Sequence, residues 1–193
     1  SNVNTLYPYM FSGWGMTDLE IPECVVEIMD NAFYDCFRLE NLTFLDSDDD
    51  LIVGFQPGTN QRGPFYQSPL TNIVVNRSLV LSESYDDACD SRDEGIFSTK
   101  HGSQNTTISL GGQVAKLPKY MLSSLPVETL TIPGTVTEIG NNVFENCTKL
   151  TTITFEPNDE NKPLTMGYYV GTSDDDGPFY SCPLTTVDLN RNI

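Results

Sequence analysis

The strongest constraint on this chain is an internal duplication. Residues 5–44 align without a gap on residues 116–155, an offset of 111, and 16 of the 40 positions are identical. The match resumes where Gly63-Pro64-Phe65-Tyr66 recurs as Gly177-Pro178-Phe179-Tyr180. A chain that repeats itself in this way builds its fold from one unit used more than once. We therefore divide it into two cassettes, about 5–80 and 116–193, linked by an inserted turn at 81–115.

Each cassette contains a shorter repeat. A strand-like unit with alternating apolar residues returns along the chain, and its second apolar residue falls at positions 21, 44, 75, 110, 132, 155 and 189. The basic spacing is 22–23 residues, and three intervals carry insertions. Such a period is typical of a solenoid, in which each turn covers the apolar face of its neighbours. We predict a single solenoid over residues 1–193 with about seven turns.

The order of elements within one turn is readable from residues 130–147. Residues 130–132 alternate and predict a short strand, which Pro133-Gly134 ends. Residues 136–139 predict a second extended piece. Residues 141–147 have room for one helical turn with Phe144 and Cys147 on the same face. The predicted fold is mainly short parallel β-strands with single helical turns, and its apolar residues superimpose from turn to turn in one elongated core.

This pattern resembles the BspA-like leucine-rich repeat family, found on the surfaces of many gut and oral anaerobic bacteria. The residues that carry the resemblance, with counterparts from Ile21 to Phe44, are Ile132-Pro133, Val136, Ile139-Gly140, Phe144-Glu145-Asn146-Cys147, Leu150 and Ile153. Cys24, Met29 and the insertions depart from the family pattern. The resemblance implies a leucine-rich-repeat solenoid and a non-enzymatic module for protein binding or adhesion, in a secreted or cell-surface bacterial protein.

Charge narrows the classes of partner. The chain has 27 acidic and 10 basic residues, a formal net charge of −17. The acidity argues against nucleic acid and against docking on an anionic membrane surface, because both need clustered Lys and Arg. No apolar stretch is long enough to span a membrane. The expected partner is a host or microbial surface protein, with a glycan as the alternative, and the expected location is extracellular or on the bacterial cell surface.

The cysteines follow the repeat. Cys36, Cys147 and Cys182 each lie three residues after a phenylalanine, and Ser68 takes the same place in another turn. A position that tolerates loss of sulfur predicts a buried thiol acting as a small apolar group, with no disulfide. Metal binding by these thiols is not expected, because there is no C-x-x-C motif and His101 is the sole histidine.

The insertions are acidic. Two interpretations of these loops stay open, either solvated loops or calcium sites built from hard oxygen ligands. The candidate calcium ligands are Asp46, Asp48 and Asp50, or Asp174, Asp175 and Asp176. A hydrolase that uses paired carboxylates from these loops is a further, less favoured hypothesis. We assign no catalytic residue, metal or cofactor and expect no enzyme.

Two surfaces are candidates for partner binding. The outward strand positions stack into one face, the surface that solenoids commonly use; they are Glu20, Thr43, Val74, Ser109, Thr131, Thr154 and Asp188. The second candidate is an aromatic patch of Trp14, Tyr168 and Tyr169, which would stack on sugar rings. In the alternative interpretation, Trp14 covers an exposed end of the solenoid, and Tyr168 and Tyr169 pack under their own loop. Because the second cassette stops where the first continues, we also expect a longer natural protein or a neighbour that covers this end.

Overall fold

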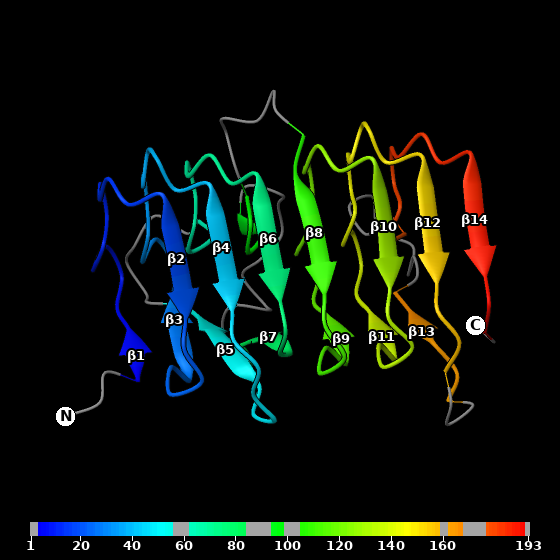
Figure 1. Ribbon diagram of the computed structural model, residues 1–193, viewed down its shortest axis with the longest axis horizontal. Helices are drawn as coiled ribbons and strands as arrows, with labels where there is room; N and C mark the ends of the chain where they lie inside the picture. Colours follow the sequence, from blue (N-terminus) through cyan, green and yellow to red (C-terminus); the bar gives the residue numbers. More distant parts are fainter. Residues whose placement is uncertain are drawn as a thin grey trace.

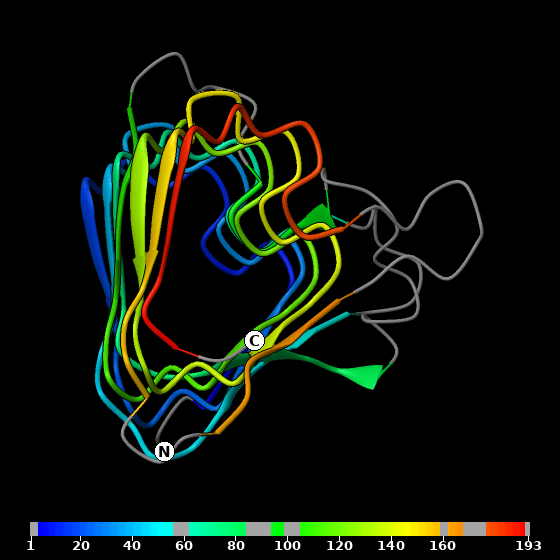
Figure 2. The same ribbon diagram turned by 90° about the vertical axis from the view of Figure 1, so that its right-hand side faces the viewer.

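The computed structural model describes residues 4–55, 62–83, 94–98, 105–158, 162–167 and 177–191. The chain winds as a coil whose turns stack along one axis, with β1 at one end of the stack and β14 at the other (Figure 1). Viewed along that axis, successive turns superimpose around a shared interior (Figure 2). All strand pairs are parallel, so the predicted solenoid of short parallel strands is confirmed. Among the described residues, no helix has the length and apolar character that crossing a membrane requires.

Two layers of strands alternate along the chain. The front layer consists of β2 (Asp18–Ile21), β4 (Asn41–Phe44), β6 (Asn72–Val75), β8 (Thr107–Leu110), β10 (Thr129–Ile132), β12 (Thr152–Phe155) and β14 (Thr186–Leu189). The back layer consists of β1 (Thr5–Leu6), β3 (Glu27–Met29), β5 (Leu51–Gly54), β7 (Leu79–Leu81), β9 (Lys116–Leu117), β11 (Glu138–Ile139) and β13 (Thr165–Met166). We call one back-layer strand, the turn segment after it and the next front-layer strand a rung, and number the rungs 1 to 7.

The core lies inside the coil, enclosed by the two layers and the turn segments (Figure 2), and is built from the predicted repeat positions. In β10, for example, Leu130 and Ile132 are buried while Thr129 and Thr131 are exposed. Burial of each such aliphatic side chain stabilises the fold by about 1.5–3 kcal/mol. A single rung cannot bury its own apolar side chains. This stabilisation therefore depends on contacts with both neighbouring rungs.

A column of phenylalanines runs through the turn segments. The ring centroids lie 5.2 Å apart for Phe11–Phe33 and Phe33–Phe65, 6.0 Å for Phe65–Phe97 and 4.9 Å for Phe144–Phe179; the rings are nearly parallel except for Phe65–Phe97, which are inclined by 27°. Stacked rings at this spacing gain stability beyond the area that they bury. Leu122, fully buried, is the residue of rung 5 at this position. The expected superposition of the phenylalanines from rung to rung is thus present.

The cysteine position has a polar role as well as an apolar one. Each side chain donates a hydrogen bond to a main-chain carbonyl of the preceding rung: Cys36 to Phe11 (3.1 Å), Ser68 to Phe33 (3.0 Å), Cys147 to Leu122 (3.1 Å) and Cys182 to Phe144 (2.9 Å). Cys24, Cys36, Cys147 and Cys182 are free thiols. Burial raises the pKa of the Cys36 thiol, which disfavours the reactive thiolate. In rungs 2, 3, 6 and 7 this position therefore holds a small side chain that donates a hydrogen bond, so serine can replace cysteine in rung 3, whereas rung 5 has the buried Leu125 there.

The segment predicted as one helical turn has a different backbone. In rung 6, residues 141–147 form successive tight turns, closed by hydrogen bonds from Glu145 N to Asn142 O (3.0 Å) and from Cys147 N to Phe144 O (3.1 Å). Asn142 and Asn146 both have φ of 56°, in the left-handed region. A left-handed residue interrupts helical hydrogen bonding, so the chain changes direction here instead of starting a helix.

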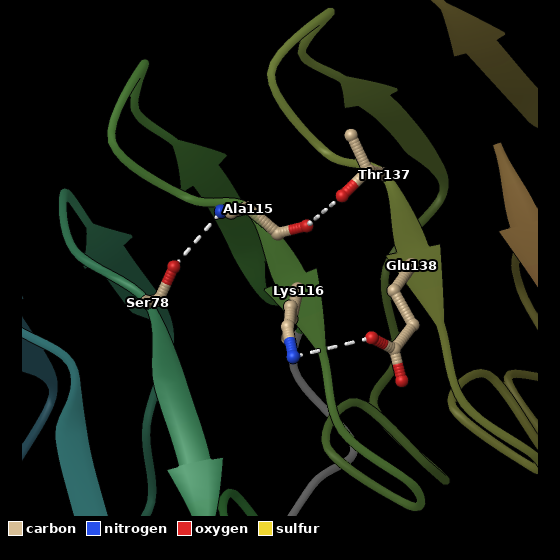
Figure 3. Close-up of polar contacts among 5 residues, drawn as sticks. All are labelled: Ser78, Ala115, Lys116, Thr137 and Glu138. Carbon is tan, nitrogen blue, oxygen red and sulfur yellow. Dashed lines mark hydrogen bonds and ion pairs between the residues drawn. The ribbon is translucent and has the colours of Figure 1, made fainter. Parts of the chain in front are cut away.

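The ladders of both layers break at the same place. The front layer is hydrogen-bonded as β2-β4-β6-β8 and separately as β10-β12-β14, and the back layer as β1-β3-β5-β7 and β9-β11-β13. Both breaks fall between rung 4 and rung 5, and we call this boundary the seam. Ala115 N crosses it to the Ser78 hydroxyl (2.9 Å, Figure 3), and Thr106 N crosses it to Pro126 O (3.1 Å). The seam therefore joins two blocks of rungs largely by packing.

Candidate functional site

The predicted partner-binding residues lie on the outer face of the front layer. Strand pairing places Glu20, Thr43, Val74 and Ser109 in one row, and Thr131, Thr154 and Asp188 in another. Glu20, Ser109, Thr131 and Asp188 are exposed, whereas Thr43, Val74 and Thr154 are half-buried between their neighbours. The seven strands lie side by side along the molecule (Figure 1). We call this surface the front face.

The first residue of each front-layer strand also faces outward, and these residues form a further row beside the row of predicted binding residues. Asn41 Nδ2 donates to Asp18 Oδ1 at 2.8 Å, and the Thr107 hydroxyl donates to Asn72 Oδ1 at 2.9 Å. Hydrogen bonds from Thr17 and Asn41 lower the pKa of Asp18. The side chains of this row are thus partly fixed by one another before any partner arrives, and less of their conformational entropy remains to be lost on binding.

The front face carries no charge in its centre. On both rows, the residues of β4, β6, β8, β10 and β12 are neutral, while Asp18 and Glu20 lie on β2 and Asp188 lies on β14. Charged groups on edge strands oppose unwanted pairing with other sheets. A long neutral polar surface offers hydrogen-bonding groups to a partner without a large cost of removing water from charges.

A groove on the back layer was missed by the sequence analysis. It has a volume of about 510 Å³ and lies on the seam, lined by β7, β9, β11 and β13. Figure 3 shows Lys116 and Glu138 reaching toward each other on neighbouring strands, with Nζ and Oε2 3.4 Å apart. Both side chains are about half exposed, so the ion pair adds little stability. The back-layer strands have only two or three residues around the groove, too few for an alternating pattern to reveal them.

The proposed aromatic patch is only partly described. Trp14 is exposed in rung 1, and its ring meets that of Phe11 edge-on at a centroid distance of 5.0 Å. Tyr168 and Tyr169 lie outside the described residues. They follow β13, which belongs to rung 7, whereas Trp14 belongs to rung 1 at the other end of the stack (Figure 1). Trp14 and β13 therefore lie in rungs at opposite ends of the stack.

The acidic loop that contains Asp46, Asp48 and Asp50 is held to the rest of the fold through its main chain. Arg77 is fully buried and donates from Nε and Nη2 to Asp49 O (3.1 and 2.7 Å) and from Nη1 to the carbonyls of Glu23 and Val25 (3.3 and 3.0 Å). Among the described residues, including Asp46, Asp48 and Asp50, no group of three or more His, Cys, Asp or Glu is arranged to hold a metal ion. Asp174, Asp175 and Asp176 lie outside the described residues, as does His101.

The stacked rungs, the parallel layers and the repeating apolar positions define the class of this protein, a leucine-rich-repeat solenoid. The family model for the BspA type leucine-rich repeat region, in six copies, matches residues 1–54 and 61–193. The chain belongs to this family, as the sequence resemblance predicted.

One solved structure shows the same fold, and a second is reported with it. The pneumococcal vaccine antigen PcpA is 14% identical, with a TM-score of 0.55, over 86% of this chain and 38% of that one. A leucine-rich cell-surface protein of Faecalibacterium prausnitzii A2-165 is 21% identical, with a TM-score of 0.36, over 84% of this chain and 44% of that one. The chain thus spans less than half of each structure. None of the curated proteins matches it.

Proposed function

We propose that the chain is a non-enzymatic module that binds a protein partner through the front face, in a secreted or cell-surface bacterial protein. The observation that carries this proposal is the in-register row of outward side chains, which extends from β2 to β8 and again from β10 to β14. A rigid repeat scaffold holds such a row at fixed spacing, while its side chains vary without affecting the core.

The neutral polar character of the front face supports a protein partner. Threonine and asparagine both donate and accept hydrogen bonds, and here they stand on strands whose backbone is already fixed. The BspA type repeat family and the description of one similar structure as a cell-surface protein favour location at the bacterial surface.

The proposal is tested by binding measurements with matched variants. Host extracellular-matrix proteins, microbial surface proteins and a glycan array are probed with the purified chain. Thr131→Arg and Thr154→Arg, combined, place two bulky cations on paired positions of β10 and β12. Thr165→Arg, at the exposed first residue of the back-layer strand β13, is the control.

We expect at least one protein to bind, with an affinity reduced at least tenfold, about 1.4 kcal/mol, by the front-face double variant and unchanged by Thr165→Arg. Equal loss with both variants, or no loss with either, would contradict the role of the front face. Binding to glycans alone would replace the protein partner by a carbohydrate.

A further inference from the structure

The front layer is interrupted in its middle. β8 and β10 are neighbours in the stack (Figure 1), but the hydrogen-bonded ladder stops at β8 and starts again at β10. Ile108 and Leu110, on the inner side of β8, are only partly buried, whereas their counterparts in β4, β6, β10 and β12 are buried. A cleft of about 430 Å³ lies on the front face at this point, and we call it the seam cleft.

A proline contributes to this interruption. In other rungs, the residue after a front strand donates its N–H to the carbonyl that ends the preceding front strand. These bonds are Leu45 N to Ile21 O (3.0 Å), Asn76 N to Phe44 O (3.3 Å), Gly111 N to Val75 O (2.8 Å) and Glu156 N to Ile132 O (2.9 Å). Pro133 holds this place after β10 and has no N–H. Leu110 O therefore lacks the donor that its counterparts have.

The lining of the seam cleft is apolar in part and negatively charged at one residue. Glu156 is the single charged residue of the lining. Its side chain is exposed, and within the described part of the chain no group forms a hydrogen bond or an ion pair with its carboxylate. The remaining lining residues supply apolar surface or hydroxyl groups; they are Ile108, Leu110 and Pro133, and Ser109, Thr129 and Thr131.

This lining matches a side chain with an apolar stem and a cationic end. Arginine and lysine both lay their aliphatic stems on apolar surface while the charged end stays among polar groups. Arginine fits better, because its planar guanidinium carries several donors and can bond a carboxylate and a carbonyl at the same time. A cationic ligand is also attracted by the net charge of −17 on the chain.

The fold already holds guanidinium groups on main-chain carbonyls. The buried Arg77 donates to the carbonyls of Asp49, Glu23 and Val25, which belong to two other rungs. Arg191 Nη1 donates to Gly134 O at 2.9 Å. Carbonyls of stacked rungs thus lie where one guanidinium can reach more than one of them, which favours the same kind of contact at Leu110 O.

We propose that the seam cleft binds an arginine side chain of a partner protein. The stem lies on Ile108 and Leu110, and the guanidinium donates to the Glu156 carboxylate and to Leu110 O. This inference rests on the function proposed for the front face, because it names a group that this face recognises in its partner. Salt screens exposed charges, so the contact weakens as ionic strength rises.

A small peptide tests the seam cleft without the whole partner. Acetyl-Gly-Arg-Gly-amide is added to the isotope-labelled chain, up to about 20 mM, and the amide signals are followed by NMR. We expect saturable shifts at Ser109, Thr129 and Thr131 and none at Thr165 on the back layer. The same peptide with citrulline, which keeps the shape of arginine without its charge, should bind at least about fivefold more weakly.

Glu156→Gln should weaken binding of the arginine peptide by at least about fivefold. Glu138→Gln is the matched control, because it removes an exposed carboxylate on the back layer, and it should leave the affinity unchanged. Shifts outside the seam cleft, no saturable shifts, equal binding of the citrulline peptide, or an unchanged affinity in Glu156→Gln would each overturn the inference. None of these results contradicts the front-face proposal, which is tested with whole proteins. Binding of the peptide without any protein partner would contradict that proposal instead.

Discussion

At the scale of single residues, the repeat position of Cys147 and Ser68 holds a hydrogen-bond donor as well as a small side chain. Cys147 lies in a fully buried position and donates to Leu122 O, while Ser68 makes the same bond in rung 3. A sequence comparison of the two rungs shows that cysteine and serine exchange there. The comparison does not show that the side chain donates to a carbonyl of the preceding rung, because that carbonyl lies 25 residues away in the chain.

The donor requirement predicts an unusual order of stability for substitutions of Cys147. Cys147→Ser keeps the hydrogen bond and should cost about 1 kcal/mol or less. Cys147→Ala removes this bond, leaves Leu122 O with only the longer bond from Leu125 N (3.4 Å), and opens a small cavity, so it should cost about 2 kcal/mol. Urea unfolding of both variants measures the difference. Greater stability of the alanine variant would show that the thiol acts only as an apolar group.

Close backbone packing at glycine gives a second prediction. Gly63→Ala forces a Cβ against the carbonyl of Gly95 and should lower the free energy of unfolding by about 3 kcal/mol. Gly112→Ala, with open space around it, should change it by less than about 0.5 kcal/mol. Thermal unfolding compares the two, and similar Tm values for both variants would refute the close contact.

At the scale of elements, strands and turns differ in how well their sequence reveals them. The front-layer strands have four residues with an alternating pattern, and they form where that pattern predicts. The turn segments have helix-like spacing, yet their backbone bends at left-handed residues. Equivalent left-handed positions are held by Gly13, Asp35, Ser124 and Asn146, so no single residue type marks them.

The left-handed backbone at Ser124 predicts opposite effects for two substitutions. Its φ is 60°, whereas glycine stands at the equivalent position 13 with φ of 74°. Ser124→Gly should raise the free energy of unfolding by about 0.5 kcal/mol, because glycine adopts this conformation without steric cost. Ser124→Val should lower it by at least about 1 kcal/mol. Urea midpoints check both, and a stabilising valine would be incompatible with a left-handed residue here.

At the scale of the whole molecule, the seam divides one solenoid into blocks of four and three rungs. Neither layer carries a ladder across it in the described part of the chain. The stability of a repeat protein is approximately the sum of its rungs and of the contacts between neighbouring rungs, so a weaker contact lowers cooperativity. The block of rungs 5–7 is smaller, and its last strand is exposed along its whole length.

This division predicts that unfolding is not two-state. Trp14, the single tryptophan, reports on rung 1. In Trp14→Phe/Tyr180→Trp the reporter moves to rung 7. We expect the rung 7 probe to report a urea midpoint at least about 0.5 M below that of Trp14, with circular dichroism between them. Coincident curves from all three measurements would show that the seam transmits full cooperativity.

The sequence by itself determined the solenoid, its seven rungs, the residues of its core and the outward row of the front face. These features depend on periodicity, because residues at the same position of each repeat occupy the same position in each stacked rung. Only the tertiary structure decided the rest. The left-handed turns, the carbonyls that receive the Cys147 and Ser68 bonds, the burial of Arg77 and the groove at the seam all depend on which main-chain atoms of one rung meet those of another. These contacts join residues far apart in the chain, so no sequence pattern within a single rung predicts them.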